Sequence, residues 1–212
     1  MATGHSESAC SLQKARLRRE MTASREQLSA EDCLRAAEGF RRCLPRLIEK
    51  SGLAGRPLRV AVYAAMRMEA DLSLVCEDLV NAGHEIYYPA VQGRGASARL
   101  VFARLPEGVT AVDFLKPGCF GVSEPAADCW LDDAPQFDLM LLPGLAFDLA
   151  GNRLGWGRAF YDRLISRMPR RPVLAGVCYP FQILPEGVPC QETDQPVDWL
   201  LTPEQPLPCQ AL

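Results

Sequence analysis

Residues 59–91, RVAVYAAMRMEADLSLVCEDLVNAGHEIYYPAV, contain the change of pattern that decides the fold class. The apolar run at 59–64 predicts a buried strand, residues 72–81 predict a helix that ends before Gly83, and residues 85–91 predict a second strand. A strand, a helix and a strand in roughly 30 residues form a βαβ unit, whose two strands run parallel. The segment therefore predicts an α/β protein built on a parallel sheet.

Later segments extend this sheet. Residues 137–142, FDLMLL, are almost all apolar, which is typical of a central parallel strand buried on both faces. Residues 172–179 and 197–201 predict further strands, and residues 99–104 predict a short strand at an edge or in a hairpin. Residues 160–168 predict a helix after the central strand.

A helical segment precedes the sheet. Apolar residues recur at helical spacing through 12–27 and 30–50, and Ser29 with Asp32 resembles the capping box that starts many helices. The length of 212 residues fits one domain. We expect a disordered N-terminal tail at 1–11, a single α/β domain at 12–202 and a C-terminal tail at 203–212.

Composition limits the classes of function. The formal net charge is −3, which disfavours a generally basic nucleic-acid binder. No apolar run approaches the roughly 20 residues of a membrane span. Nine cysteines occur without a CxxC pair and with only two histidines, so no zinc site is predicted. We expect reduced, mostly buried thiols in a cytoplasmic, monomeric protein.

Residues 142–162, LPGLAFDLAGNRLGWGRAFYD, directly follow the apolar strand at 137–142 and carry the chemistry. Glycines let backbone N–H groups approach phosphate oxygens, and Arg153 and Arg158 add positive charge. The helix that begins near Arg158 directs its N-terminus at the loop, and Asp162 inside it could hold Mg²⁺. The glycines of the loop are Gly144, Gly151, Gly155 and Gly157.

Neither common nucleotide fingerprint is present in this loop. The spacing GxxxxGK[ST] is absent, and Phe160 stands where GxGxxG requires its third glycine. The segment could also be a plain glycine-rich connection with solvated arginines. Glycines and arginines directly after a buried strand favour an anion-binding loop over that interpretation.

The string Pro143-Gly-Leu-Ala-Phe-Asp-x-x-Gly-x-Arg-Leu-Gly-x-Gly…Tyr161-Asp162 resembles the 5-formyltetrahydrofolate cyclo-ligase family, also called 5,10-methenyltetrahydrofolate synthetases. Three further pairs match that family in the right order: Lys14 with Arg18, Glu69 with Asp71, and Asp194 with Asp198. The resemblance spans about residues 12–202. It implies a three-layer αβα fold with a mainly parallel central sheet, like that of ribose-phosphate isomerases and CoA transferases, preceded by N-terminal helices.

The resemblance also implies a reaction. ATP phosphorylates the formyl oxygen of 5-formyltetrahydrofolate, N10 attacks the activated carbon, and loss of phosphate leaves 5,10-methenyltetrahydrofolate. ATP is the co-substrate and Mg²⁺ the cofactor. Such a transfer depends mainly on positioning and on neutralising phosphate charge.

The resemblance carries roles to individual positions. Lys14, Arg153 and Arg158 are the expected catalytic residues, and Asp198 is expected to be structural. ATP-binding residues are expected at Lys14, Arg18, Arg153, Leu154, Gly155, Trp156, Gly157, Arg158, Ala159, Phe160 and Tyr161. Folate-binding residues are expected at Ala64, Glu69, Trp156, Gly157, Arg158, Ala159 and Phe160, and metal ligands at Asp162 and Asp194.

Two positions depart from the family's usual Gly-x-Gly-x-Gly-Tyr-Tyr-Asp. Ala159 replaces a glycine and Phe160 replaces a tyrosine. If the glycine position needs positive φ, alanine would weaken phosphate binding; if it is already helical, alanine is harmless. Phe160 keeps the ring and loses a hydroxyl, which costs about 1 kcal/mol if that hydroxyl binds substrate.

Two other functions fit the same residues. A phosphorylated-sugar enzyme of the same fold would use the anion loop without ATP. A folate- or nucleotide-binding regulator would have lost activity through Ala159 and Phe160, and would bind 5-formyltetrahydrofolate without forming ADP.

Overall fold

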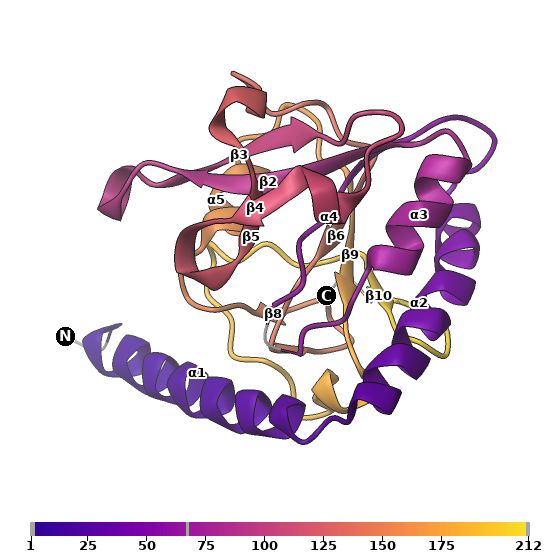
Figure 1. Ribbon diagram of the computed structural model, residues 1–212. Helices are drawn as coiled ribbons and strands as arrows, with labels where there is room; N and C mark the ends of the chain where they lie inside the picture. The colour runs from indigo at the N-terminus through magenta and orange to yellow at the C-terminus, as the bar shows by residue number, and fades with distance from the viewer. Residues whose placement is uncertain (1–2, 67, 211–212) are drawn as a thin grey trace.

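A seven-stranded sheet forms the centre of the computed structural model, which describes residues 3–66 and 68–210 (Figure 1). The strand order is β11-β10-β9-β6-β1-β2-β3. The inner strands run parallel, and β3 and β11 pair antiparallel at the two edges. The strands are β1 (Arg59–Ala61), β2 (Glu85–Gln92), β3 (Arg99–Arg104), β6 (Leu139–Leu142), β9 (Val173–Val177), β10 (Trp199–Leu201) and β11 (Pro206–Pro208). The expected mainly parallel α/β fold is confirmed.

Helices and two small hairpins surround this sheet. The hairpins are β4 (Leu115–Pro117) with β5 (Ser123–Pro125) and β7 (Ala146–Phe147) with β8 (Arg153–Leu154). The α-helices are α1 (Thr3–Glu26), α2 (Ala30–Lys50), α3 (Ser73–Asn81), α4 (Ala111–Phe114) and α5 (Phe160–Ile165). Short 3₁₀ turns cover Gly95–Ser97, Cys119–Gly121, Ala127–Cys129 and Pro180–Gln182. The capping box of Ser29 and Asp32 starts α2 as expected.

Side chains along each inner strand alternate between the two faces of the sheet, and this divides the core into two layers. In β6, Leu139 and Leu141 pack in the cluster that contains the apolar faces of α2 and α3. Met140 and Leu142 point the other way, into the cluster that contains Ile165 of α5. Because successive side chains of a strand face opposite sides, a fully apolar strand needs helices on both sides. The three-layer arrangement follows.

The chain changes direction across the sheet at β1. From β1 it runs through α3 to β2 on one side, and β6, β9 and β10 lie on the other side of β1. β1 and β6 are parallel neighbours, with Val60 beside Leu139. In open α/β sheets, ligands bind beyond the carboxyl ends of strands at such a switch point. The segments after Ala61 and after Leu142 are therefore placed side by side at the binding edge.

Several boundaries differ from those expected. α1 begins at Thr3, so residues 3–11 are helical rather than a disordered tail. β11 lies within the expected C-terminal tail and pairs with β10. α5 ends at Ile165 rather than at residue 168. The nine cysteines are free thiols, as expected. Of these, Cys43, Cys76 and Cys178 are buried, so the prediction that most of the thiols are buried was wrong.

None of the helices within the described residues is long and apolar enough to cross a membrane.

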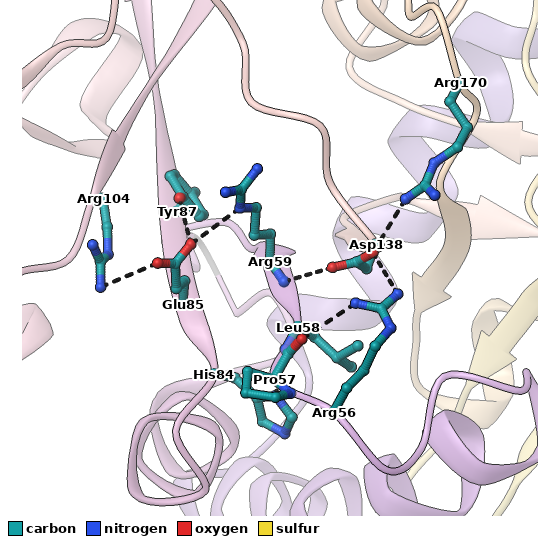
Figure 2. Close-up of polar contacts among 10 residues, drawn as sticks. All are labelled: Arg56, Pro57, Leu58, Arg59, His84, Glu85, Tyr87, Arg104, Asp138 and Arg170. Carbon is teal, nitrogen blue, oxygen red and sulfur yellow. Dashed lines mark hydrogen bonds and ion pairs between the residues drawn. The ribbon is translucent and has the colours of Figure 1, made fainter.

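Asp138 joins its own segment to residues 56–59 and to the turn that carries Arg170, at the amino-terminal edge of the sheet, opposite the binding edge (Figure 2). Its Oδ1 accepts hydrogen bonds from Arg56 Nη2 at 2.7 Å and Arg170 Nη2 at 3.2 Å. Its Oδ2 accepts one from the backbone N–H of Arg59 at 2.9 Å. A cavity of about 590 Å³ lies here, and its carboxylates, Asp138 and Glu85, are paired with arginines. The paired charges at this edge therefore stabilise the fold.

Replacing Asp138 with Asn should lower the free energy of unfolding by about 2 kcal/mol at neutral pH, because charged hydrogen bonds to a buried group are lost. Hydrogen bonding to Arg56 lowers the pKa of Asp138. The stabilisation is therefore complete above the unfolded carboxyl pKa of about 3.9 and disappears as pH falls through the lower folded pKa. Urea unfolding of both proteins across pH measures this. The exposed Asp132→Asn is the control. If Asp138→Asn lowered the free energy of unfolding equally at low and at neutral pH, the ionised carboxylate would not be the source of the stabilisation.

Candidate functional site

The segment after β6 turns back as a hairpin that a buried carboxylate holds in place. Asp148 Oδ1 accepts hydrogen bonds from the backbone N–H groups of Ala150 and Asn152 at 3.0 and 2.9 Å. Its Oδ2 accepts from the backbone N–H of Val188 at 2.8 Å. Asp148 is buried, so each of these bonds replaces one to water. The hairpin of β7 and β8 thereby becomes a rigid base for the loop that follows it.

Helix α1 lies against this hairpin. Leu17 and Met21 pack on a buried cluster, which lies at the base of the loop. The cluster consists of Leu145, Ala146, Leu154, Leu184 and Val188. Lys14 and Arg18 are one helical turn apart, and this docking brings Arg18 to the glycine loop and Lys14 to Asp194.

Arg18 binds the loop through its backbone. Arg18 Nε donates to the carbonyl oxygen of Gly155 at 2.9 Å. Gly157 has a φ of +90°, and a Cβ at this position would lie 3.2 Å from Nη2 of Arg18. The left-handed backbone favours glycine here, and a Cβ would also press on the Arg18 guanidinium. Arg18 therefore lies at the glycine loop, and its binding of ATP phosphates stays a prediction.

Lys14 and the two expected metal ligands meet beside the loop. Lys14 Nζ donates to Asp194 Oδ2 at 2.7 Å. Arg153 Nη2 donates to the Oδ1 and Oδ2 atoms of Asp162 at 3.1 and 3.2 Å. Asp162 Oδ1 also accepts from the backbone N–H of Gln195 at 3.1 Å, which brings Asp162 next to the segment that carries Asp194. Each carboxylate is paired with a cation.

The donor set fits a magnesium ion that is shared with phosphate. The described residues include no group of three or more His, Cys, Asp or Glu side chains arranged to hold a metal. Mg²⁺ is usually held by one or two carboxylates together with substrate phosphates and water. Asp162 and Asp194, which lie in adjoining segments next to the glycine loop, could offer the two carboxylates of such a set.

Glu69 reaches the loop from the segment after β1. Its Oε1 accepts from Trp156 Nε1 at 3.1 Å, and its Oε2 accepts from the backbone N–H of Met66 at 3.2 Å. Glu69 is 8% exposed. Burial raises the pKa of its carboxyl, while the Trp156 N–H and the charge of Arg25 act in the opposite direction.

A cavity of about 440 Å³ lies beside Glu69. Ala64 lines it, as the resemblance implied for a folate pocket, and apolar side chains of Met66, Ala111 and Val112 border it. A cavity with both apolar and polar walls and one buried carboxylate suits a flat heterocycle that carries N–H donors.

Two non-glycine residues have positive φ among those that the structure describes, and both border this site. Ala159 has a φ of 49° and precedes α5, and Met68 has a φ of 60° and precedes Glu69. A left-handed conformation costs a residue with a Cβ roughly 1–2 kcal/mol, and such strain is concentrated at functional sites. Of the two alternatives for Ala159, the structure therefore selects the one in which glycine is favoured.

The remaining loop residues take different positions. Arg158 is exposed, and Phe160 lies under the guanidinium of Arg163 at 5.3 Å. Tyr161 lies under that of Arg153 at 5.6 Å. The Leu154 side chain is buried in the cluster beneath α1, so only its backbone can face a ligand.

Asp198 lies outside this site. Its Oδ1 accepts from Arg171 Nη1 at 2.6 Å and its Oδ2 from the backbone N–H of Leu174 at 2.8 Å. These bonds join the segment before β10 to β9. The structural role expected for Asp198 is confirmed.

Sequence reasoning missed Arg25, which the structure places beside Glu69 and Trp156. Its spacing from Lys14 and Arg18 was a usable signal, because positions i, i+4 and i+11 share one helix face. The neighbouring Arg16 is instead mostly exposed and paired with Glu20, which shows how the basic residues of α1 divide between two faces.

The fold and site together define an α/β protein with a glycine- and arginine-rich loop and a buried carboxylate at the switch point of a mainly parallel sheet. Residues 10–203 match the model of the 5-formyltetrahydrofolate cyclo-ligase family, and the chain belongs to that family. The family and the class of ligase expected from the sequence are thereby confirmed.

Individual relatives agree with this assignment. The chain is 28% identical to 5-formyltetrahydrofolate cyclo-ligase of Mus musculus over 204 residues, which cover 91% of this chain and 95% of that one. It is 30% identical to the Escherichia coli K12 protein of the same name, over 69% and 78% of the two chains. The NMR structure of 5,10-methenyltetrahydrofolate synthetase from Aquifex aeolicus superposes with a TM-score of 0.73 at 28% identity, covering 93% of each chain.

Replacing Ala159 with Gly should stabilise the protein by about 1 kcal/mol, because glycine adopts positive φ without strain. Ala159 is exposed, so no packing is lost. Urea unfolding measures the change. Ala126→Gly is the control: Ala126 is also exposed, but its φ is −60°, so glycine there should give no stabilisation. Equal effects of the two substitutions would show that Ala159 is not strained.

Proposed function

We propose that the protein catalyses the ATP-dependent conversion of 5-formyltetrahydrofolate to 5,10-methenyltetrahydrofolate, with release of ADP and phosphate. The observation that carries this proposal is the convergence of two kinds of group at the β1–β6 switch point. Cations and glycines suited to a triphosphate adjoin a buried carboxylate and cavity suited to a heterocycle. Membership of the cyclo-ligase family supports the same reaction.

The chemistry requires a poor leaving group to be activated. The formyl oxygen attacks the γ-phosphorus of ATP, and the bond from that phosphorus to ADP breaks. N10 then attacks the formyl carbon and loses its proton, and the carbon–oxygen bond breaks to release phosphate. Each step moves negative charge on phosphate oxygens, so the protein's contribution is positioning and charge neutralisation.

Cations from three places would supply that neutralisation. Lys14 and Arg18 come from α1, Arg153 comes from β8 and Arg158 comes from the loop after β8. In this proposal phosphate oxygens replace Asp194 as the partner of Lys14. The glycine backbone at 155 and 157 lets a triphosphate approach the N–H groups of the loop.

Asp162 and Asp194 would hold Mg²⁺ in this scheme. The ion neutralises charge on the phosphate oxygens when it is bound. Arg153, which now neutralises Asp162, would then be available to the transferred phosphoryl group. The pairing of each carboxylate with a cation keeps this charge-rich site stable before ATP binds.

Glu69 would orient the folate. The cavity beside it would hold the ring system, and a carboxylate can accept two N–H donors from one edge of an aminopyrimidinone. Trp156 links Glu69 to the glycine loop, so the ring and the phosphates are held relative to one another by one hydrogen bond of 3.1 Å. Such fixed geometry is what proximity catalysis requires.

The direct test is turnover. Purified protein with ATP, Mg²⁺ and 5-formyltetrahydrofolate should develop the absorbance of methenyltetrahydrofolate and form ADP in equal amount. Formation of product without ATP would contradict the proposal. Calorimetric binding of 5-formyltetrahydrofolate with no ADP formed would instead identify a folate-binding regulator, in line with the strain at Ala159.

Replacing Lys14 with Ala should raise the apparent KM for ATP about tenfold or more, because a charge-assisted hydrogen bond contributes about 1.5–3 kcal/mol. The KM for folate should change much less, because Lys14 lies at the phosphate end of the site. Steady-state kinetics with each substrate varied in turn separates the two. Arg16→Ala, on the exposed face of α1, is the control. Equal rises in both KM values would indicate a folding role for Lys14.

A further inference from the structure

Arg25 is buried to a degree that is unusual for arginine. It lies in the last turn of α1, and its exposed fraction is 1%. Arginine is almost never fully buried unless its charge is paired. The other basic residues of the same helix that pair locally, such as Arg16, remain exposed. The position of Arg25 therefore needs an explanation beyond helix stability.

The surroundings of Arg25 belong to the site. Its Nη1 lies 3.6 Å from Oε1 of Glu69, and its Cζ lies 5.4 Å from the centre of the Trp156 ring. None of its guanidinium nitrogens makes a hydrogen bond to the residues that the structure describes. The interaction is thus one of charge with Glu69 and with the indole face, rather than a directed hydrogen bond.

A buried ion pair of this kind is weak evidence for a stabilising role. The cost of removing both charges from water offsets much of their attraction, and apolar substitutes of the same size often stabilise as well. The pairing does, however, affect which protonation state the Glu69 carboxyl adopts. Burial alone favours the neutral acid form of Glu69, and a cation within about 4–6 Å favours the carboxylate.

We propose that Arg25 is a positioning residue that keeps Glu69 a carboxylate and holds the Trp156 ring against it. This inference rests on the proposed function, in which Glu69 accepts N–H groups of the folate ring. A neutral carboxylic acid would present a hydroxyl to one of those donors, and the match would be lost. Through Arg25, the helix that carries Lys14 and Arg18 also contributes to recognition of the folate.

The other titratable groups around Glu69 are the carboxyl of Asp71, which lines the same cavity, and three tyrosines. Burial raises the pKa of each tyrosine, so the tyrosines are neutral across the working range. They are Tyr63 after β1, Tyr161 in α5 and Tyr179 after β9, whose hydroxyl lies 3.5 Å from the Glu69 carbonyl oxygen. Arg25 is the positive charge that acts on the carboxyl.

Carbon-13 NMR of labelled glutamate carboxyls tests this without any turnover, with Glu69→Gln assigning the signal. In Arg25→Met the midpoint of the Glu69 titration should move up by about one pH unit or more. Arg25→Lys, which keeps the charge, should titrate close to the wild type, and Arg16→Met should not change it. An unchanged midpoint in Arg25→Met would overturn the proposal.

Arg25→Gln is a second neutral variant in case the methionine variant does not fold. If both neutral variants fail to fold while Arg25→Lys folds, Arg25 is structural and the proposal is wrong.

Kinetics then separates positioning from general stability. As the pH is lowered, the KM for 5-formyltetrahydrofolate should begin to rise at a higher pH in the neutral variant than in the wild type. Below the midpoint of the Glu69 titration, this KM should rise tenfold for each pH unit. The KM for ATP should not change.

In a Glu69→Gln background the Arg25 substitution should have no further effect on the folate KM, and an additive effect would contradict action through Glu69. An inactive wild type would refute the proposed function, while the NMR titration would still decide the role of Arg25.

Discussion

The parallel pairing of β1 with β6 is the constraint on which the site depends. It places the carboxyl ends of two strands, separated in the chain by residues 62–138, next to one another. One end continues to Glu69 and the other continues to the glycine loop, and the Trp156–Glu69 hydrogen bond joins them. Any register shift between these strands would separate the two halves of the site, because side-chain direction alternates along a strand.

Helix α1 completes the site from outside the sheet. Its apolar residues Leu17 and Met21 seat it on the β7–β8 hairpin, and its basic face reaches three different segments. Lys14 meets the segment of Asp194, Arg18 meets the loop, and Arg25 meets Glu69. Lys14 is paired with Asp194 and Arg153 with Asp162, so in the proposed function a triphosphate would exchange existing partners of these cations rather than order free side chains. That preorganisation reduces the entropy lost on binding.

Sequence reasoning found the features that depend on local pattern. The inner strands followed from apolar runs, the start of α2 from Ser29 and Asp32, and the loop from its glycines and arginines. It missed features that depend on distant partners. β11 contains Pro206 and Pro208 and forms only because β10 offers it an edge position, where proline is tolerated. The positive φ of Ala159 and the burial of Arg25 are likewise imposed by the tertiary structure, because neither residue type prefers that state.

The central claim is that this site transfers a phosphoryl group to the formyl oxygen. The most direct measurement follows that oxygen: 5-formyltetrahydrofolate carrying oxygen-18 in the formyl group is converted with ATP and Mg²⁺, and the released phosphate is analysed by mass spectrometry. The account predicts one labelled oxygen in each phosphate molecule. Unlabelled phosphate, with the label in water, would show that the formyl oxygen is never phosphorylated and would contradict the account.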